Sequence, residues 1–287
     1  MREIFQVFAL IFLFTSCEVI NPDEPDASFI YIEEFEIDSQ PGQGTANHKI
    51  SEIWAYADDQ IVGVYDLPAK IPVLNKGNTN LSFFGGIKNN GLSLMRIKYP
   101  FFYGHEINLN LTPNSVDTIR PKFGYFEDLS IVQKDYDGNT PSMIPLNSNE
   151  GELSMIANTD DVFEGERCGY YRLLAGSTNL AFKEDQNLAL ESGNTIFLEF
   201  NYSCNNIFNI GLISRENNSD IKNLAVIINP TTEGLQNPVW NKIYIDLGLI
   251  VKERVDAQYF EIYFEAIPDQ SGKEIELYLD NLKLVQF

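Results

Sequence analysis

Histidine, cysteine and positive charge are scarce in this chain of 287 residues. It has two histidines, three cysteines and 20 Lys+Arg against 41 Asp+Glu, which gives a formal net charge of -21. Two histidines are too few for a multi-histidine metal centre, and an acidic surface repels the phosphate backbone of nucleic acids. We therefore expect no such metal centre and no nucleic-acid partner.

Catalytic signatures are also missing. The sequence contains no Gly-x-Ser-x-Gly motif, no His-Glu-x-x-His motif, no Cys/His arrangement and no glycine-rich phosphate loop. Carboxylates are abundant, but no spacing marks two of them as the acid pair of a glycosidase. We predict that the protein is not an enzyme, and a glycan-active hydrolase is the minority alternative.

A single long apolar run is present, at residues 4–14, and it is shorter than the roughly 20 residues that a transmembrane helix needs. It follows Arg2 and ends at Thr15, Ser16 and Cys17, in the order of a signal peptide with small residues before its cleavage site. This stretch resembles a bacterial lipoprotein signal. The resemblance implies that residues 1–16 are removed and that Cys17 carries the acyl chains, palmitate among them, that anchor the protein to a membrane. An ordinary secretory signal is the alternative.

Residues 17–28 are polar and acidic, and they contain two prolines. We predict that they form an extended tether behind the lipidated cysteine. Glu18 follows Cys17, where an aspartate would resemble an inner-membrane retention signal, and further acids stand at residues 23, 24 and 26. The segment is similar to that of surface-exported lipoproteins of the Bacteroidota. The resemblance implies a lipid-anchored protein of the outer membrane, with exposure at the cell surface as a further expectation.

The rest of the chain consists of short β-branched and aromatic runs separated by Gly, Asn, Asp and Pro, which is typical of all-β sandwiches. In the first part, residues 29–124, the candidate strands are 29–37, 49–57, 60–66, 79–87, 92–98, 105–111 and 116–125. In the second part, residues 125–287, they are 129–133, 151–156, 167–174, 195–202, 208–214, 224–229, 241–247, 258–266 and 274–284. A tight turn is expected at Asp58 and Asp59, because aspartate tolerates positive φ.

Both parts resemble known families. Residues 55–63 (AYADDQIVG) and 67–77 (LPAKIPVLNKG) resemble PEGA-type and immunoglobulin-like sandwiches, which implies a spacer domain. Residues 197–202 (FLEFNY), 240–247 (WNKIYIDL) and 274–284 (EIELYLDNLKL) resemble strands of galactose-binding-like jelly rolls, including carbohydrate-binding modules. The second resemblance implies a jelly roll that binds a glycan or another envelope component. Binding of a protein partner in an outer-membrane complex is the alternative.

Residues 259–266 alternate in the way a half-buried strand does. One set, Phe260, Ile262, Phe264 and Ala266, is predicted to face the core. The opposite face carries Tyr259, Glu261, Tyr263 and Glu265. Aromatic planes beside carboxylate acceptors suit a sugar, so this face is the candidate ligand site. A solvated sheet face without a ligand is the alternative.

The jelly-roll resemblance implies a structural calcium ion at Asp280, with Glu127 or Asp128 as partners; local pairing of Asp280 is the alternative, and no other cofactor is expected. Cys168 and Cys204 either form a disulfide in an oxidising compartment or remain two buried thiols. The aromatic cluster at residues 101–103 is predicted to fill the seam between the two parts, and contact with a partner is the alternative.

Overall fold

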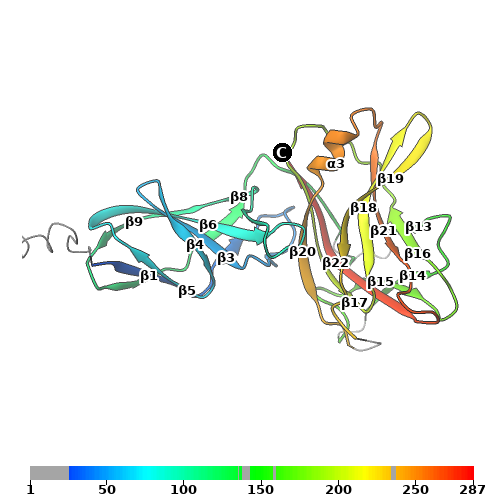
Figure 1. The fold of residues 1–287 in the computed structure, drawn as a ribbon, viewed down its shortest axis with the longest axis horizontal. Coiled ribbons are helices and arrows are strands. Elements are labelled where there is room, and N and C mark those ends of the chain that lie inside the picture. The colour runs from blue at the N-terminus through cyan, green and yellow to red at the C-terminus, as the bar shows by residue number, and fades with distance from the viewer. Residues whose placement is uncertain (1–25, 135, 138–142, 158–159, 234–236) are drawn as a thin grey trace, which may run out of the picture.

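The computed structural model describes residues 26–134, 136–137, 143–157, 160–233 and 237–287. This described chain is all-β, and it forms two sandwiches placed end to end: a first block from β1 to β11 and a second block from β12 to β22 (Figure 1). Within it, no helix is long and apolar enough to cross a membrane. The predicted signal peptide, Cys17 and most of the predicted tether lie outside the described residues.

The first block contains one larger sheet, in the order β4-β3-β6-β7 with β9 also paired to β6, and two small sheets, β10-β1-β5 and β2-β11-β8. Its strands are β1 (Ser28–Ile32), β2 (Glu36–Asp38), β3 (Glu52–Ala57), β4 (Gln60–Asp66), β5 (Ala69–Val73), β6 (Gly77–Lys88), β7 (Arg96–Lys98), β8 (Phe102–Tyr103), β9 (His105–Leu111), β10 (Val116–Thr118) and β11 (Lys122–Tyr125). The predicted turn between β3 and β4 is confirmed, since Asp58 and Asp59 have φ values of 47° and 63°.

Two features of the first block differ from the predicted strands. The predicted strands 29–37 and 116–125 are each divided in two, because the chain passes from one small sheet to the other: β1 pairs with β10, and β2 pairs with β11. The sequence pattern also missed β5, which contains Pro72. That strand lies at the edge of its sheet, where a proline costs no ladder hydrogen bond on its open side.

The second block packs a six-stranded sheet, β14-β15-β22-β17-β20 with β12 on β22, against a five-stranded sheet, β13-β16-β21-β18-β19. Its elements are β12 (Ser130–Lys134), β13 (Met143–Pro145), β14 (Glu152–Ile156), β15 (Cys168–Leu173), β16 (Leu180–Glu184), β17 (Ile196–Cys204), β18 (Phe208–Glu216), β19 (Ser219–Ile228), β20 (Asn241–Asp246), α3 (Gly248–Glu253), β21 (Phe260–Ala266) and β22 (Ile275–Gln286). Phe182, Phe200 and Phe264 are fully buried between the sheets. The predicted core face of β21 is confirmed, because Phe260, Ile262, Phe264 and Ala266 all belong to this core.

Aromatic side chains fill the seam between the blocks. Of the predicted cluster at residues 101–103, Phe101 and Phe102 are buried, whereas Tyr103 is 38% exposed. Phe101 is fully buried, and its ring centroid lies 5.8 Å from that of Phe197 and 5.2 Å from that of Phe287. The hydrophobic cluster of the first block includes Phe197, Tyr244 and Val285, which belong to strands of the second block. The two blocks therefore share one core at their junction.

A buried charge cluster lies beside these rings. Glu199 has no solvent exposure; it accepts hydrogen bonds from the hydroxyls of Tyr99 and, at 2.8 Å, Tyr125, and it pairs with Lys242 at 3.2 Å. Burial acts to raise the pKa of Glu199, but Lys242, Lys283 and the two tyrosine hydroxyls outweigh it and hold the pKa below its usual value. The seam is thus sealed by ionic as well as apolar contacts.

Candidate functional site

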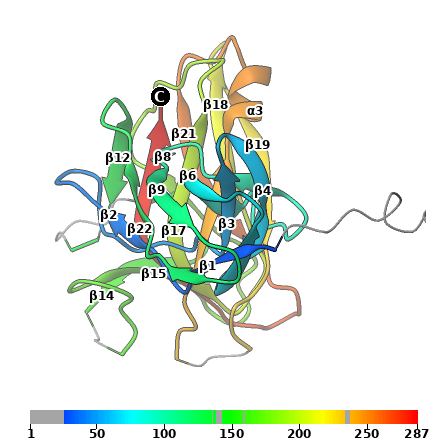
Figure 2. The same ribbon diagram turned by 90° about the vertical axis from the view of Figure 1, so that its left-hand side faces the viewer.

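The outer face of the six-stranded sheet carries a line of four aromatic rings, which we call the aromatic row: Phe163, Trp240, Tyr278 and Tyr170. Successive ring centroids are separated by 5.4, 6.2 and 5.0 Å. Phe163, Trp240 and Tyr170 are half-buried, and Tyr278 is 8% exposed. In Figure 1, β15, β17 and β22 continue below the level of the first block, and Figure 2 looks from the first block toward this sheet.

Strand alternation and register produce the row. Tyr170 on β15 stands directly opposite Tyr278 on β22, so their side chains share a face. The neighbours Tyr171, Leu277 and Leu279 point into the core. Trp240 immediately precedes β20, and Phe163 lies in the loop between β14 and β15.

Polar groups flank the row. The Tyr170 hydroxyl donates to Glu276 at 2.5 Å, and Arg172 pairs with Glu274 at 2.8 Å. Burial, followed by the hydrogen bond to Glu276, raises the pKa of Tyr170. The indole nitrogen of Trp240 and the side-chain oxygen of Asn201 are buried and have no hydrogen-bond partner among the residues that the structure describes. Most buried polar atoms in proteins form hydrogen bonds, so these two atoms are exceptions on this face of the sheet.

Asp280 lies on the same sheet face and is fully buried. Its two carboxylate oxygens accept from the backbone N–H groups of Glu164 at 3.1 Å and Asn281 at 2.8 Å. Burial is the main cause that raises its pKa to about 7; nearby Asp137 and Glu164 raise it further, while the two N–H donors oppose the shift.

The predicted calcium ligands do not come together. The register of β12 and β22 pairs Ser130 with Gln286, so Glu127 and Asp128 lie beyond the end of β22 that is far from Asp280. Among the described residues, no group of three or more His, Cys, Asp or Glu side chains is arranged to hold a metal ion. The carboxylate of Asp280 is instead satisfied by backbone N–H groups, and the proposed ligand set is wrong.

The predicted ligand face of β21 forms, but its central ring is covered. Tyr259, Glu261, Tyr263 and Glu265 alternate with the core residues as expected, yet Tyr263 is 3% exposed. Lysines from the neighbouring strands close over it: Lys183 pairs with Glu261 at 2.6 Å, and Lys222 pairs with Glu265 at 2.8 Å. Lys222 also lies 5.4 Å from the Tyr263 ring centroid. In this arrangement Tyr263 offers no free plane to a sugar, and both carboxylates have ion-pair partners.

Cys168 and Cys204 are free and buried. They lie on β15 and β17, with β22 between them, so their strands are about 9–10 Å apart at the usual strand spacing. A disulfide needs Cα atoms within about 7 Å, so the structure excludes this alternative. Burial raises the pKa of each thiol to about 12, which leaves both unreactive at neutral pH.

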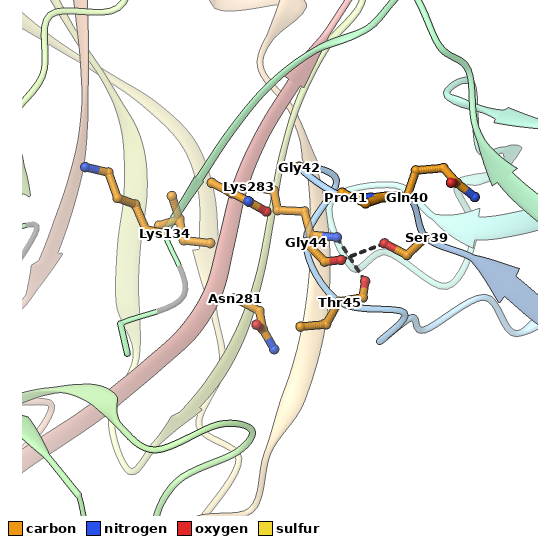
Figure 3. A pocket seen from close by; sticks show the side chains of 11 residues that line it. Ser39, Gln40, Pro41, Gly42, Gly44, Thr45, Lys134, Asn281 and Lys283 are labelled. Atoms are coloured by element: carbon orange, nitrogen blue, oxygen red, sulfur yellow. Dashed lines mark hydrogen bonds between the residues drawn. The ribbon is translucent and has the colours of Figure 1, made fainter. Parts of the chain in front are cut away.

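A pocket of about 370 Å³ opens at the seam between residues 39–45 of the first block and strands β12 and β22 (Figure 3). Its buried cation is already used within the protein, because the ammonium of Lys283 donates to the carbonyl of Thr45 at 3.3 Å. Burial lowers the pKa of Lys283 to about 8. Gly44 has a φ of 78°, and a Cβ atom there would lie 2.4 Å from the Lys283 side chain. The Lys283 side chain thus packs closely against Gly44 and Thr45 at the wall of this pocket, and these contacts join the two blocks.

Comparison with known proteins gives a limited result. No protein-family model and no curated protein sequence matches the chain. A family 29 carbohydrate-binding module is similar at 15% identity and a TM-score of 0.34, over 55% of this chain and 87% of that one. A variant of such a module, solved with mannohexaose, is similar at 14% identity and a TM-score of 0.34, over 55% and 90%. The family 22 module and catalytic module of a Clostridium thermocellum xylanase, solved with xylohexaose, are similar at 12% identity and a TM-score of 0.36, over 53% and 28%. Similarity this distant assigns no function.

Proposed function

We propose that the protein is a non-catalytic glycan-binding protein of the cell envelope, which binds its ligand along the aromatic row of the second block. Cys17 would anchor it by acyl chains to the outer membrane, and the first block, similar in sequence to PEGA-type and immunoglobulin-like modules, would serve as the spacer. Surface exposure of the anchored protein is part of the same proposal.

The observation that carries the proposal is the aromatic row itself. Phe163, Trp240 and Tyr170 are half-buried, so part of each ring is open to the C–H face of a sugar, and Tyr278 packs between Trp240 and Tyr170. Glu276 and Arg172 at the edge of the row provide an acceptor and a donor for hydroxyl groups. The thiol of Cys168 lies two residues before Tyr170 on β15, but it is buried and burial raises its pKa to about 12, which favours binding without chemistry.

We expect replacement of Trp240 or Tyr278 by alanine to weaken glycan binding at least tenfold, which corresponds to about 1.4 kcal/mol. The first change removes a stacking surface, and the second removes the ring that packs between Trp240 and Tyr170. A glycan array screened with the wild-type protein would identify the ligand, and calorimetry would compare the variants. Tyr31→Ala is the matched control, since Tyr31 is a half-buried tyrosine on β1 in the first block. Thermal melting would show that each variant is folded.

Other outcomes would redirect the proposal. Loss of glycan binding in Tyr259→Ala and not in Tyr278→Ala would assign the glycan site to the five-stranded sheet. Absence of any glycan ligand would contradict the proposal and favour the protein-partner alternative. That alternative has its own support in the loop between β6 and β7, where Leu92, Leu94 and Met95 are 51, 97 and 44% exposed. A cross-linked envelope protein that is lost in Leu94→Ser would then identify the function.

A further inference from the structure

One ring of the aromatic row lies on a loop. Phe163 belongs to the segment between β14 and β15, whereas the other three rings lie on strands or directly beside one. A ring on a strand is placed by the sheet itself, but a ring on a loop is placed only if contacts fix the backbone next to it. The residues that follow Phe163 have such contacts, and the nearest of them come from β22.

Two neighbouring residues of β22 bind Glu164, the residue directly after Phe163. One carboxylate oxygen of Asp280 accepts a hydrogen bond from the backbone N–H of Glu164 at 3.1 Å. The side-chain amide of Asn281 donates to the carboxylate of Glu164 at 3.0 Å. Both β22 side chains are shielded from water, since Asp280 is 0% and Asn281 5% exposed. Glu164 is therefore fixed through its backbone and through its side chain.

A β-bulge allows both side chains to reach the same residue. In a regular strand, consecutive side chains point to opposite faces of the sheet. The register of β17 and β22 changes between Glu199 and Asn201, and β22 has one extra residue at this point. Asn281 lies inside this stretch and has a φ of 50°, a left-handed conformation that asparagine tolerates better than most residues. Bulges re-aim side chains, and this one brings Asn281 to the side of the sheet on which Asp280 lies.

The far side of the loop is held by a second carboxylate. One oxygen of Asp137 accepts from the backbone N–H groups of Glu166 at 2.6 Å and Arg167 at 3.1 Å. Between these anchor points Gly165 has a φ of 73°, and a Cβ atom there would lie 2.4 Å from the Asp137 carboxylate. The loop is thus bound on both sides, directly after Phe163.

We propose that Asp280 and Asn281 are positioning residues of the glycan site, which hold this loop so that Phe163 completes the aromatic row. The positioning role rests on the proposed function, since it concerns the same site. The ring of Phe163 packs on that of Trp240, with centroids 5.4 Å apart. Release of Glu164 would free Phe163 to leave Trp240, and the row would lose the ring at one end.

The first measurement needs no glycan. Trp54→Phe leaves Trp240 as the single tryptophan, so acrylamide quenching of fluorescence then reports access to its indole ring. In this background Asn281→Gly keeps the left-handed backbone and removes the amide; we expect the quenching constant to rise about twofold. Phe163→Ala should produce the same rise. The two changes combined should produce no further rise, because both remove the same contact.

Asn90→Gly is the matched control. Asn90 also has a left-handed backbone, with a φ of 55°, and its side chain accepts from the backbone N–H of Asp246 at 2.9 Å. This contact lies at the seam and not beside Phe163. The control should leave the quenching of Trp240 unchanged, and thermal melting would show that each variant is folded.

A charge exchange tests the contact between Asn281 and Glu164 directly. Asn281→Asp sets two carboxylates against each other, so it should raise the quenching constant as Asn281→Gly does. Adding Glu164→Gln restores one donor and one acceptor, and it should return quenching to the value of the parent protein. Asp280→Ala, which removes the acceptor of the Glu164 N–H, should also raise the quenching constant.

The second measurement is binding to the whole protein. Calorimetry would compare mannohexaose, xylohexaose and cellohexaose with the disaccharides of the same sugars. Because Phe163 lies at one end of the row, we expect Asn281→Gly to weaken hexasaccharide binding about three- to tenfold and disaccharide binding less. Phe163→Ala should have the same effect on each length.

Unchanged quenching in Asn281→Gly, additive effects of Asn281→Gly and Phe163→Ala, or an equal rise in Asn90→Gly would overturn the proposal. Equal losses of affinity for hexasaccharide and disaccharide would overturn it as well. If none of the three hexasaccharides bound to the wild-type protein, the proposed function would lose its support. Quenching would then still decide whether Asn281 holds Phe163 against Trp240.

Discussion

Replacement of Glu199 by alanine is expected to lower the free energy of unfolding by about 3–5 kcal/mol, the usual cost of removing one partner from a buried ion pair. The change would leave Lys242 and Lys283, which are 5 and 2% exposed, as buried cations without their carboxylate. It would also remove the acceptor of the Tyr99 and Tyr125 hydroxyls. Urea unfolding at pH 7, followed by circular dichroism, would measure the loss.

Glu34→Ala is the matched control for this experiment. Glu34 pairs with Arg120 at 2.8 Å, but both side chains are more than half exposed, and such surface pairs contribute about 0–1 kcal/mol. If Glu199→Ala destabilised the protein no more than Glu34→Ala does, the seam cluster would have no net role in stability. Tryptophan fluorescence gives a second measurement of unfolding in each block, since Trp54 lies in the first block and Trp240 in the second.

The second large effect concerns pH. The pKa of Asp280 is about 7 in the folded protein against an ordinary value of 3.8. Between these values the folded protein holds a proton that the unfolded chain has released, so stability from this group falls as the pH rises from about 4 to about 7. The full difference corresponds to about 4 kcal/mol. Asp280→Asn removes the titration, and its stability relative to wild type should increase by roughly that amount from pH 4 to pH 8.

Urea unfolding of both proteins at several pH values between 4 and 8 would check this expectation. Comparing the difference between variant and wild type cancels the contributions of other carboxylates, such as Glu184, whose pKa is also raised by burial. Asp220→Asn serves as the control, because Asp220 is an exposed residue paired with Arg215. Parallel stability curves for wild type and Asp280→Asn would show that Asp280 is ionised at little cost in the folded state.

The all-β architecture could be predicted from the sequence because strand alternation and turn chemistry are local. Strands β4 and β9 begin and end at the predicted residues, and the turn at Asp58 and Asp59 has the predicted positive φ. The prediction failed where tertiary context decides. Strand β5 tolerates Pro72 because its edge is open, and the short strand β13 is held by its pairing with β16, not by its own sequence pattern.

The candidate site was harder to predict, since it depends on which strands are neighbours. The alternation around Tyr263 was correct, but Lys183 and Lys222, which cover that ring, come from adjacent strands that the pattern cannot identify. Glu276, Tyr278 and Asp280 show the same interleaving of tyrosine and carboxylate, and this signal was present in the sequence. Recognising it as a platform required the register that brings residues 170 and 240 to the same sheet.

The shared core at the junction has a consequence for how the chain acquires its structure. The hydrophobic cluster of the first block is completed by Phe197, Tyr244 and Val285, which lie on β17, β20 and β22 of the second block. An amino-terminal fragment ending after β11 would expose Tyr99 and Phe101 to water. The two blocks are therefore coupled in folding, because the core of the first block is complete only when β17, β20 and β22 have packed against it.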